Sequence, residues 1–193
     1  NFYNLGADQA INTQGRIEQN TLSLTQGDTL NAMFAENASF PLITYQENIL
    51  TLAETSIRAG NFDAALGYLN EYRAFLNEGG YIDATYQAAF TLAYEPYVAE
   101  DFAPGGMENA DGIAANDALL REIVEERYVT FYGQTIAWND ERRTRGSLEG
   151  IPISPNIGAE LPWRFVYSQF EINGNPNVPR PVPGPFENMT IYQ

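Results

Sequence analysis

The stretch that decides the fold runs from residue 44 to residue 80 and reads TYQENILTLAETSIRAGNFDAALGYLNEYRAFLNEGG. It opens with a capping box, in which the hydroxyl of Thr44 accepts from the Glu47 amide and the Glu47 side chain returns to the Thr44 amide. Ala59-Gly60 supplies the C-terminal stop. Between these signals, apolar side chains recur at helical spacing, which predicts an amphipathic helix over residues 44–59. They are Tyr45, Ile49, Leu52, Ala53 and Ile57.

A second apolar stripe follows at once and ends at Gly79-Gly80, which predicts a second helix from Phe62 onwards. Two amphipathic helices joined by the tight Gly60-Asn61 link must pack antiparallel. The small Ala53 and Ala65 allow the two helices to approach closely. The turn over residues 58–65 resembles that of a tetratricopeptide repeat. The second stripe contains Phe62, Ala65, Leu66, Leu69, Arg73 and Leu76.

The rest of the chain alternates between helical patterns and loops. Residues 84–94 predict another helix, which Pro96 ends. A long helix is predicted from Asn116, as N-cap, to near Gly133, because apolar residues at 120, 123, 124, 128 and 131 form one stripe. No segment shows the strong alternation typical of a strand. The predicted fold class is therefore mainly α, with tetratricopeptide-like helix pairs and long irregular loops.

The two ends of the chain differ from this helical middle. Residues 1–40 are rich in Asn, Gln, Thr and Gly, which indicates a loop-rich lead-in that belongs to a larger domain. After Arg145 the sequence becomes rich in Pro and Gly, with residues 180–193 as its last part. We expect this tail to be extended and wrapped on the surface of the protein.

Composition excludes several classes of function. The 193 residues carry a net charge of −15, with ten Arg and no Lys. A chain this acidic repels phosphate backbones, so nucleic acid is not an expected partner. Cys and His are both absent. Their absence rules out catalytic triads built on His, thiolate chemistry and His-rich zinc sites.

Between residues 40 and 179, short motifs follow one another in an order that resembles the C-terminal half of the SusD/RagB-like nutrient-binding proteins. The resemblance covers residues 41–179, roughly three quarters of the chain. Trp163 departs from it, because a polar residue is expected there. The motifs are FPLITYQE (40–47), LAE (52–54), LNEYR (69–73), LREIVEERY (120–128), FYGQ (131–134), WNDERRT (138–144), LPWRFVY (161–167) and EINGNPNVP (171–179).

The resemblance implies a SusD-like fold and a binding function without bond cleavage or cofactor. A family member is a lipid-anchored outer-membrane protein at the cell surface. It forms a lid on a SusC-like TonB-dependent transporter and passes it oligosaccharides or, in some members, peptides. We expect the chain to be a fragment, because the family's N-terminal helical repeats and lipidated cysteine are missing. A self-assembling surface or filament subunit built from a SusD-like module is the alternative.

The charged residues of the motifs have a structural and a catalytic interpretation. A Glu and an Arg on neighbouring elements usually form an ion pair that locks a helix to the chain after it. A carboxylate-based glycoside hydrolase is the weaker hypothesis, because spacing in one sequence does not identify its acids. We therefore assign structural roles to Glu126, Arg127, Asp140, Arg142 and Arg143.

Aromatic residues in loops are the candidate ligand contacts, because flat rings outside a helical stripe suit sugar faces and peptide side chains. They are Tyr94, Tyr97, Phe102 and Trp163. Tyr128, Phe131 and Trp138 lie at or near helical spacing and are assigned to the core. The loop also carries acidic residues without the spacing of an EF-hand, so we expect a solvated acidic loop and no metal site. These acids are Glu95, Glu100, Asp101, Glu108 and Asp111.

Overall fold

The computed structural model describes residues 42–80, 94–155, 158 and 160–187. The described residues form helices joined by turns and loops, and none of them lies in a strand. The mainly α class predicted from the sequence is therefore confirmed for this part of the chain. None of the helices found there is long and apolar enough to cross a membrane. The lead-in over residues 1–40 and the helix predicted over 84–94, apart from Tyr94, lie outside the described residues.

The decisive stretch forms two helices, α3 (Tyr45–Arg58) and α4 (Phe62–Asn77), as its two stripes predict. Each begins at a side-chain cap: Thr44 Oγ1 accepts from the amide three residues on at 3.1 Å, and Asn61 Oδ1 does the same at 3.2 Å. Gly60 joins the helices with a φ of 81°, a conformation that glycine adopts without steric cost. The caps and the glycine together set the tight link.

The two helices pack antiparallel. The Tyr45 ring at the start of α3 lies 5.0 Å from the Phe75 ring near the end of α4. The hydroxyl of Tyr45 also donates to Glu71 Oε1 at 2.8 Å. The predicted stripe is wrong at two positions, because Tyr45 and Leu52 are each 38% exposed while Leu50 is completely buried. The reason is that α3 packs against both α4 and α6, and these two helices together determine which side chains of α3 are buried.

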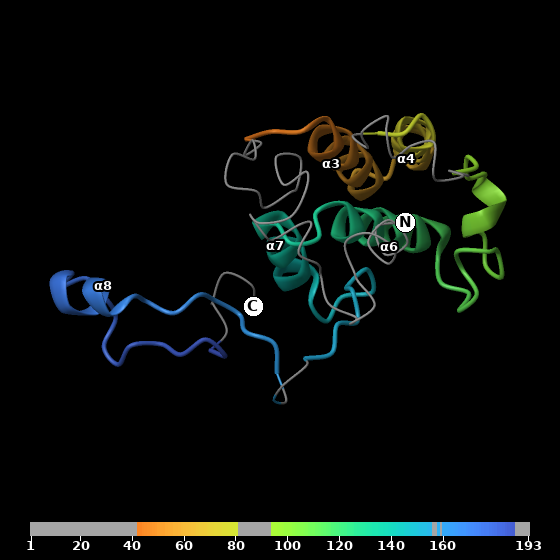
Figure 1. Cartoon of the computed structure of the whole chain (residues 1–193). Helices are drawn as coiled ribbons and strands as arrows, with labels where there is room; N and C mark the ends of the chain where they lie inside the picture. Colours follow the sequence, from red (N-terminus) through yellow and green to blue (C-terminus); the bar gives the residue numbers. More distant parts are fainter. Residues whose placement is uncertain (1–41, 81–93, 156–157, 159, 188–193) are drawn as a thin grey trace, which may run out of the picture.

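Helix α6 (Ala115–Thr130) lies against both α3 and α4 and completes the core (Figure 1). Its start differs from the prediction: Ala114 is the N-cap, and no side chain caps the helix. Asn116 is therefore a residue of the first turn, and the expectation that it caps the helix is wrong. The main buried apolar side chains come from all three helices and the turn after α6: Ile49, Leu50, Ala53, Ile57, Ala65, Leu69, Tyr72, Ala118, Leu119, Ile123 and Phe131.

The ten-residue helix α7 (Thr135–Thr144) packs against α6 and is absent from the sequence-based prediction. Its buried residues include Asp140, Glu141 and Thr144, so polar side chains form much of its inner face. A search for an apolar stripe misses such a helix, because its inner face is held by ion pairs. Trp138 on α7 is half-buried, whereas the sequence analysis assigned it to the core.

Residues 94–114, which precede α6, contain a short 3-10 helix, η3 (Ala99–Phe102), and fold around one buried amide. Asn109 is completely buried, and its Nδ2 donates to the carbonyl oxygens of Phe102 and Ile113, each at 2.8 Å. Its Oδ1 accepts from the Ile113 amide at 2.9 Å. Gly106 packs so closely that a Cβ there would lie 2.3 Å from the carbonyl oxygen of Glu100. The loop is therefore tightly built.

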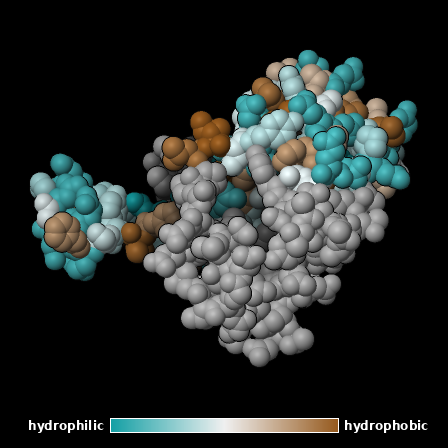
Figure 2. Space-filling view, turned by 45° about the horizontal axis from the view of Figure 1, so that its top comes forward, coloured by the Kyte–Doolittle hydropathy of each residue, from teal (hydrophilic) through white to brown (hydrophobic). Residues whose placement is uncertain are grey.

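The C-terminal segment over residues 160–187 carries helix α8 (Gln169–Gly174) and extends to one side of the helical body (Figure 1). Its base is fixed at Arg145, which donates to the carbonyl oxygens of Leu161 and Pro162, each at 3.0 Å. Figure 2 shows the α8 region as a lobe beside the main body. Hydrogen bonds and a ring contact join the first residues of this segment to the helices, and residues 188–193 of the predicted tail lie outside the described residues.

Candidate functional site

A network of four charged side chains joins α3, α6 and α7. Arg127 Nε donates to Asp140 Oδ2 at 2.8 Å, and its nearest approach to Glu54 is 3.5 Å. Arg143 bonds the same two acids, at 2.9 Å to Asp140 Oδ1 and 2.6 Å to Glu54 Oε2. Each arginine thus lies between two carboxylates, which is the geometry that the structural interpretation of Arg127, Asp140 and Arg143 predicts.

Glu54 is the member of this network that the sequence analysis did not select. Burial alone would raise the pKa of Glu54, but the hydrogen bonds and positive charge of Arg143, with help from Arg58 and Arg127, hold that pKa below its usual value. Its signal in the sequence is a carboxylate directly after Ala53, on the buried side of α3. A search for amphipathic periodicity treats a glutamate as solvent-exposed, so it does not identify Glu54 as a buried ion-pair partner.

The other two residues assigned structural roles lie outside this network. Glu126 pairs with Arg73 of α4 at 3.6 Å. Burial raises the pKa of Glu126, against the positive charge of Arg73. The Arg142 guanidinium carbon lies 4.9 Å from the centroid of the Trp138 ring. Glu126 therefore links two helices, and Arg142 covers an aromatic ring.

Two of the four candidate ligand aromatics are core residues. Phe102 is completely buried, and its ring packs edge-on against Tyr97, with ring centroids 5.3 Å apart. Tyr97 is only 8% exposed, and the Arg73 guanidinium carbon lies 3.9 Å from the centroid of its ring. The expectation that these rings form an exposed stacking platform does not fit this arrangement. The reason is that both rings join the main hydrophobic core, where the Phe102 ring lies 6.2 Å from the Phe62 ring of α4, and sequence spacing does not reveal this contact.

Tyr94 and Trp163 are half-buried and do not lie in the core cluster. The Arg73 guanidinium carbon lies 5.7 Å from the centroid of the Tyr94 ring. Trp163 stacks under Arg145, whose guanidinium carbon is 3.9 Å from the ring centroid. Arg145 is itself fixed by Glu141 at 2.6 Å. Trp163 is therefore held at the base of the C-terminal segment and remains the main aromatic candidate.

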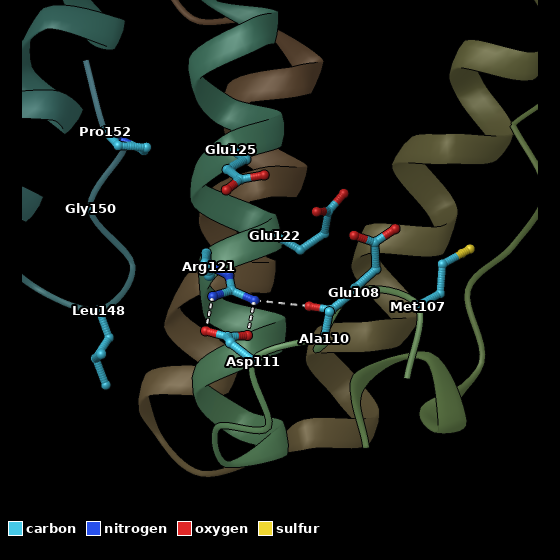
Figure 3. A pocket seen from close by; sticks show the side chains of 10 residues that line it. All are labelled: Met107, Glu108, Ala110, Asp111, Arg121, Glu122, Glu125, Leu148, Gly150 and Pro152. Atoms are coloured by element: carbon cyan, nitrogen blue, oxygen red, sulfur yellow. Dashed lines mark hydrogen bonds and ion pairs between the residues drawn. The ribbon is translucent and has the colours of Figure 1, made fainter. Parts of the chain in front are cut away.

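An open pocket of about 460 Å³ lies between the loop before α6, helix α6 itself and the segment after α7 (Figure 3). Met107, Leu148 and Pro152 contribute apolar surface, and three glutamates contribute charge. Among the lining residues that the structure describes, Arg121 is the one cation, and it donates two hydrogen bonds to Asp111, of 2.8 and 3.0 Å. The pocket is lined by Met107, Glu108, Ala110, Asp111, Arg121, Glu122, Glu125, Leu148, Gly150 and Pro152.

Two of the pocket's glutamates meet at one hydroxyl. The Tyr97 hydroxyl donates to Glu122 Oε1 at 2.8 Å, and its oxygen lies 3.1 Å from Glu108 Oε1. The sequence analysis placed Glu108 in a solvated loop and gave Glu122 no role. The sequence does contain a signal, because Glu122, Glu125 and Glu126 are three and four residues apart and so lie on neighbouring positions of one helix face.

The electrostatics of this pocket are opposite to those of the ion-pair network. Burial raises the pKa of Glu122 to about 7; the hydrogen bond from Tyr97 opposes this rise, and the negative charges of Glu126, Glu108 and Glu125 add to it. Burial and the charge of Glu108 also raise the pKa of Glu125, against the charge of Arg121. Within the described ranges, no group of three or more acidic side chains is arranged to hold a metal ion.

Comparisons with family models, with curated proteins and with solved structures find no match to this chain. The resemblance to SusD/RagB-like proteins therefore rests on the ordered sequence motifs alone and stays a prediction.

Proposed function

We propose that this chain is part of a non-catalytic, SusD-like nutrient-binding protein at the outer membrane. It holds an oligosaccharide or a peptide at the cell surface and passes it to a SusC-like TonB-dependent transporter. The proposal includes tetratricopeptide-like pairing of α3 and α4 and a lipid anchor in the full-length protein. Nucleic acid is not among the proposed partners.

The observation that carries the proposal is the meeting of motif residues from distant parts of the sequence. Glu54, Arg127, Asp140 and Arg143 come from three of the motifs and form one ion-pair network. Arg73 of the LNEYR motif pairs with Glu126 of the LREIVEERY motif. Trp138 of the WNDERRT motif contacts Phe165 of the LPWRFVY motif, with ring centroids 5.4 Å apart.

The same network argues against a catalytic role for the acids of the motifs. A glycoside hydrolase needs one carboxyl group to give up a proton and a second to act as base or nucleophile. In the network, arginines bond both carboxylates and hold the pKa of Glu54 low, so neither acid is suited to proton transfer. The motif residues therefore fix the helices in place.

The charge of the chain sets the proposed ligand class. At −15 the protein repels sulfated and uronic-acid polymers, so neutral oligosaccharides and cationic peptides are the favoured ligands. The pocket beside α6 combines apolar surface from Met107, Leu148 and Pro152 with carboxylates, and that combination suits the same ligands. Trp163 provides an aromatic surface at the base of the C-terminal segment.

Calorimetric titration of the full chain tests the proposal. The panel is neutral oligosaccharides, uronic-acid glycans and short lysine-containing peptides, each with product analysis after incubation. We expect heat from neutral glycans or cationic peptides, weaker binding by Trp163→Ala, and ligands recovered uncut. Leu52→Ala, which removes an exposed side chain of α3, is the matched control. Cleaved glycans, or binding of polyanions alone, would refute the proposal.

One observation favours the alternative, a self-assembling surface subunit. The C-terminal segment exposes large apolar side chains, with Phe170 at 87% and Phe165 at 71%. Large exposed apolar surfaces often mark contacts with other proteins. Light scattering coupled to size exclusion distinguishes the two functions, because a self-assembling subunit grows in mass with concentration and Phe170→Ser suppresses that growth.

A further inference from the structure

We propose that Glu108, Tyr97 and Glu122 form a pH-sensitive latch, in which one shared proton fastens the loop over residues 95–113 to helix α6. The latch goes beyond nutrient binding and does not depend on it. It rests on the contacts that one hydroxyl makes with two carboxylates from two different elements.

The three side chains have one hydrogen too few for their two contacts when both glutamates are ionised. A tyrosine hydroxyl has one hydrogen to donate, whereas an ionised carboxylate only accepts. Tyr97 lies at hydrogen-bond distance from both Glu122, at 2.8 Å, and Glu108, at 3.1 Å. With both glutamates ionised, one of these contacts has no hydrogen and sets two oxygen lone pairs against each other. A proton on either carboxyl group supplies the missing hydrogen, and Tyr97 then donates to one glutamate and accepts from the other.

The cations near this pair that the structure describes are engaged with other groups. Among the described residues, no arginine lies within 4 Å of a Glu108 or Glu122 carboxylate oxygen. Arg121 of α6 is held by Asp111, and Arg73 of α4 covers the Tyr97 ring and pairs with Glu126. The lining residues after α7, Leu148, Gly150 and Pro152, bring no charge.

The remaining titratable groups favour the same proton. Glu125 and Glu126 on α6 add negative charge near Glu122, and burial with these charges raises the pKa of Glu122 to about 7. The Tyr97 hydroxyl keeps its own hydrogen, because burial and the charge of Glu122 raise the pKa of Tyr97 far above its usual value. The shared proton is therefore bound and released near neutral pH.

Below pH 7 the shared proton holds the loop over residues 95–113 against α6, and above pH 7 the loss of this proton weakens the contact. When the proton leaves, two negative charges face each other, and Tyr97 can donate to only one of them. Glu108 lies on the loop and Glu122 on α6, so their repulsion acts between the two elements that line the pocket (Figure 3). The net charge of the pocket and the contact between the loop and α6 thus change over the same pH range.

Carbon-13 NMR of the full chain labelled at the glutamate carboxyl carbons tests the latch. We expect one resonance to titrate near pH 7 in the wild-type chain and to vanish in Glu122→Gln. In Tyr97→Phe the midpoint shifts, because both contacts of the shared hydroxyl are lost. Glu100→Gln, which removes an exposed acid of η3, is the matched control and leaves the midpoint unchanged.

Amide hydrogen exchange gives a second readout. Protection of the loop amides that bond within residues 98–113 should fall by at least tenfold from pH 6 to pH 8.5, after correction for intrinsic exchange, and Glu122→Gln should remove this fall. If Glu122→Gln does not fold, Glu108→Gln replaces it, and the Glu122 midpoint then drops because a negative neighbour is gone. Titration of every glutamate in its ordinary acidic range would overturn the proposal.

Discussion

Two clusters of buried or half-buried charge lie on different faces of helix α6 and use the same residue types in opposite ways. In the network of Glu54, Arg127, Asp140 and Arg143, two cations lie between two acids. At Glu108 and Glu122 the acids meet a tyrosine and no cation. The pKa of Glu54 is accordingly lowered, and that of Glu122 is raised. Burial desolvates both glutamates, so the partner decides the sign.

The difference has a consequence for stability. A lowered pKa stabilises the fold above the acidic range of a glutamate and loses this effect as the pH falls. A raised pKa stabilises the fold at acidic pH and loses this effect as the pH rises through the folded-state pKa, which for Glu122 is about 7. The ion-pair network therefore keeps its contribution to stability at neutral pH, whereas the pair of Glu108 and Glu122 loses its proton, and the contribution of that proton, near pH 7.

The largest effect is expected from Asp140→Asn. This substitution keeps the shape of the side chain but leaves Arg127 and Arg143 with Glu54 alone, and the Asp140 side chain is only 5% exposed. Loss of one member of a buried ion pair should cost about 3 to 4 kcal/mol of unfolding free energy. Urea denaturation at pH 7 measures the loss, with Glu78→Gln, an exposed acid at the end of α4, as the control. A cost below about 1 kcal/mol would contradict the locking role and reopen the catalytic interpretation.

The second prediction concerns Gly106→Ala, which changes the loop that carries Glu108. A Cβ at residue 106 would lie 2.3 and 2.4 Å from the carbonyl oxygens of Glu100 and Asp101, so Gly106→Ala must shift the turn that carries Glu108. The strain should cost about 2 kcal/mol, and the midpoint of Glu122 should fall as Glu108 moves away. Thermal melting and the carboxyl titration check both effects. Gly67→Ala, in open space on α4, is the control and should melt no lower than the wild type.

The third prediction compares the two glutamates directly at pH 5 and pH 8. Glu54→Gln should destabilise the fold at both pH values, because Arg143 and Arg127 lose a charged partner. Glu122→Gln should stabilise it by about 1 to 2 kcal/mol at pH 8, where the wild type carries the extra charge, and change little at pH 5. Urea denaturation at the two pH values measures this. Equal effects of Glu122→Gln at both would show that Glu122 does not titrate between them.

The sequence predicts the elements whose inner faces are apolar. The stripes and caps of residues 44–80 predict α3 and α4, and the stripe after residue 116 predicts α6, because apolar spacing decides how these helices pack. Helix α7 is missed, because its inner face consists largely of ion-paired residues. The predicted cap at Asn116 is wrong because the helix begins before it, at Ala115, without a side-chain cap.

The candidate site could be predicted less well than the fold. Motif order identified Arg127, Asp140 and Arg143, but not their partner Glu54, because a pair between α3 and α7 depends on the tertiary arrangement. Phe102 and Tyr97 were expected in contact with ligand and are buried, since the loop inserts both rings into the core formed by the helices. Glu108 and Glu122 meet only after the loop folds back on α6.

The smallest effect is expected at the edge of the ion-pair network. Arg58 bonds Glu54 at 2.8 Å and Glu149 at 3.0 Å, but its side chain is 41% exposed, so water screens both pairs. Arg58→Gln should therefore cost only about 0.5 kcal/mol, and most of that cost should disappear in 1 M salt. A double-mutant cycle with Glu149→Gln in urea denaturation measures the coupling. A loss above about 2 kcal/mol that persists in salt would make Arg58 a third buried cation of the network. Three arginines would then balance the charge of Glu54, and its surroundings would differ further from those of Glu122.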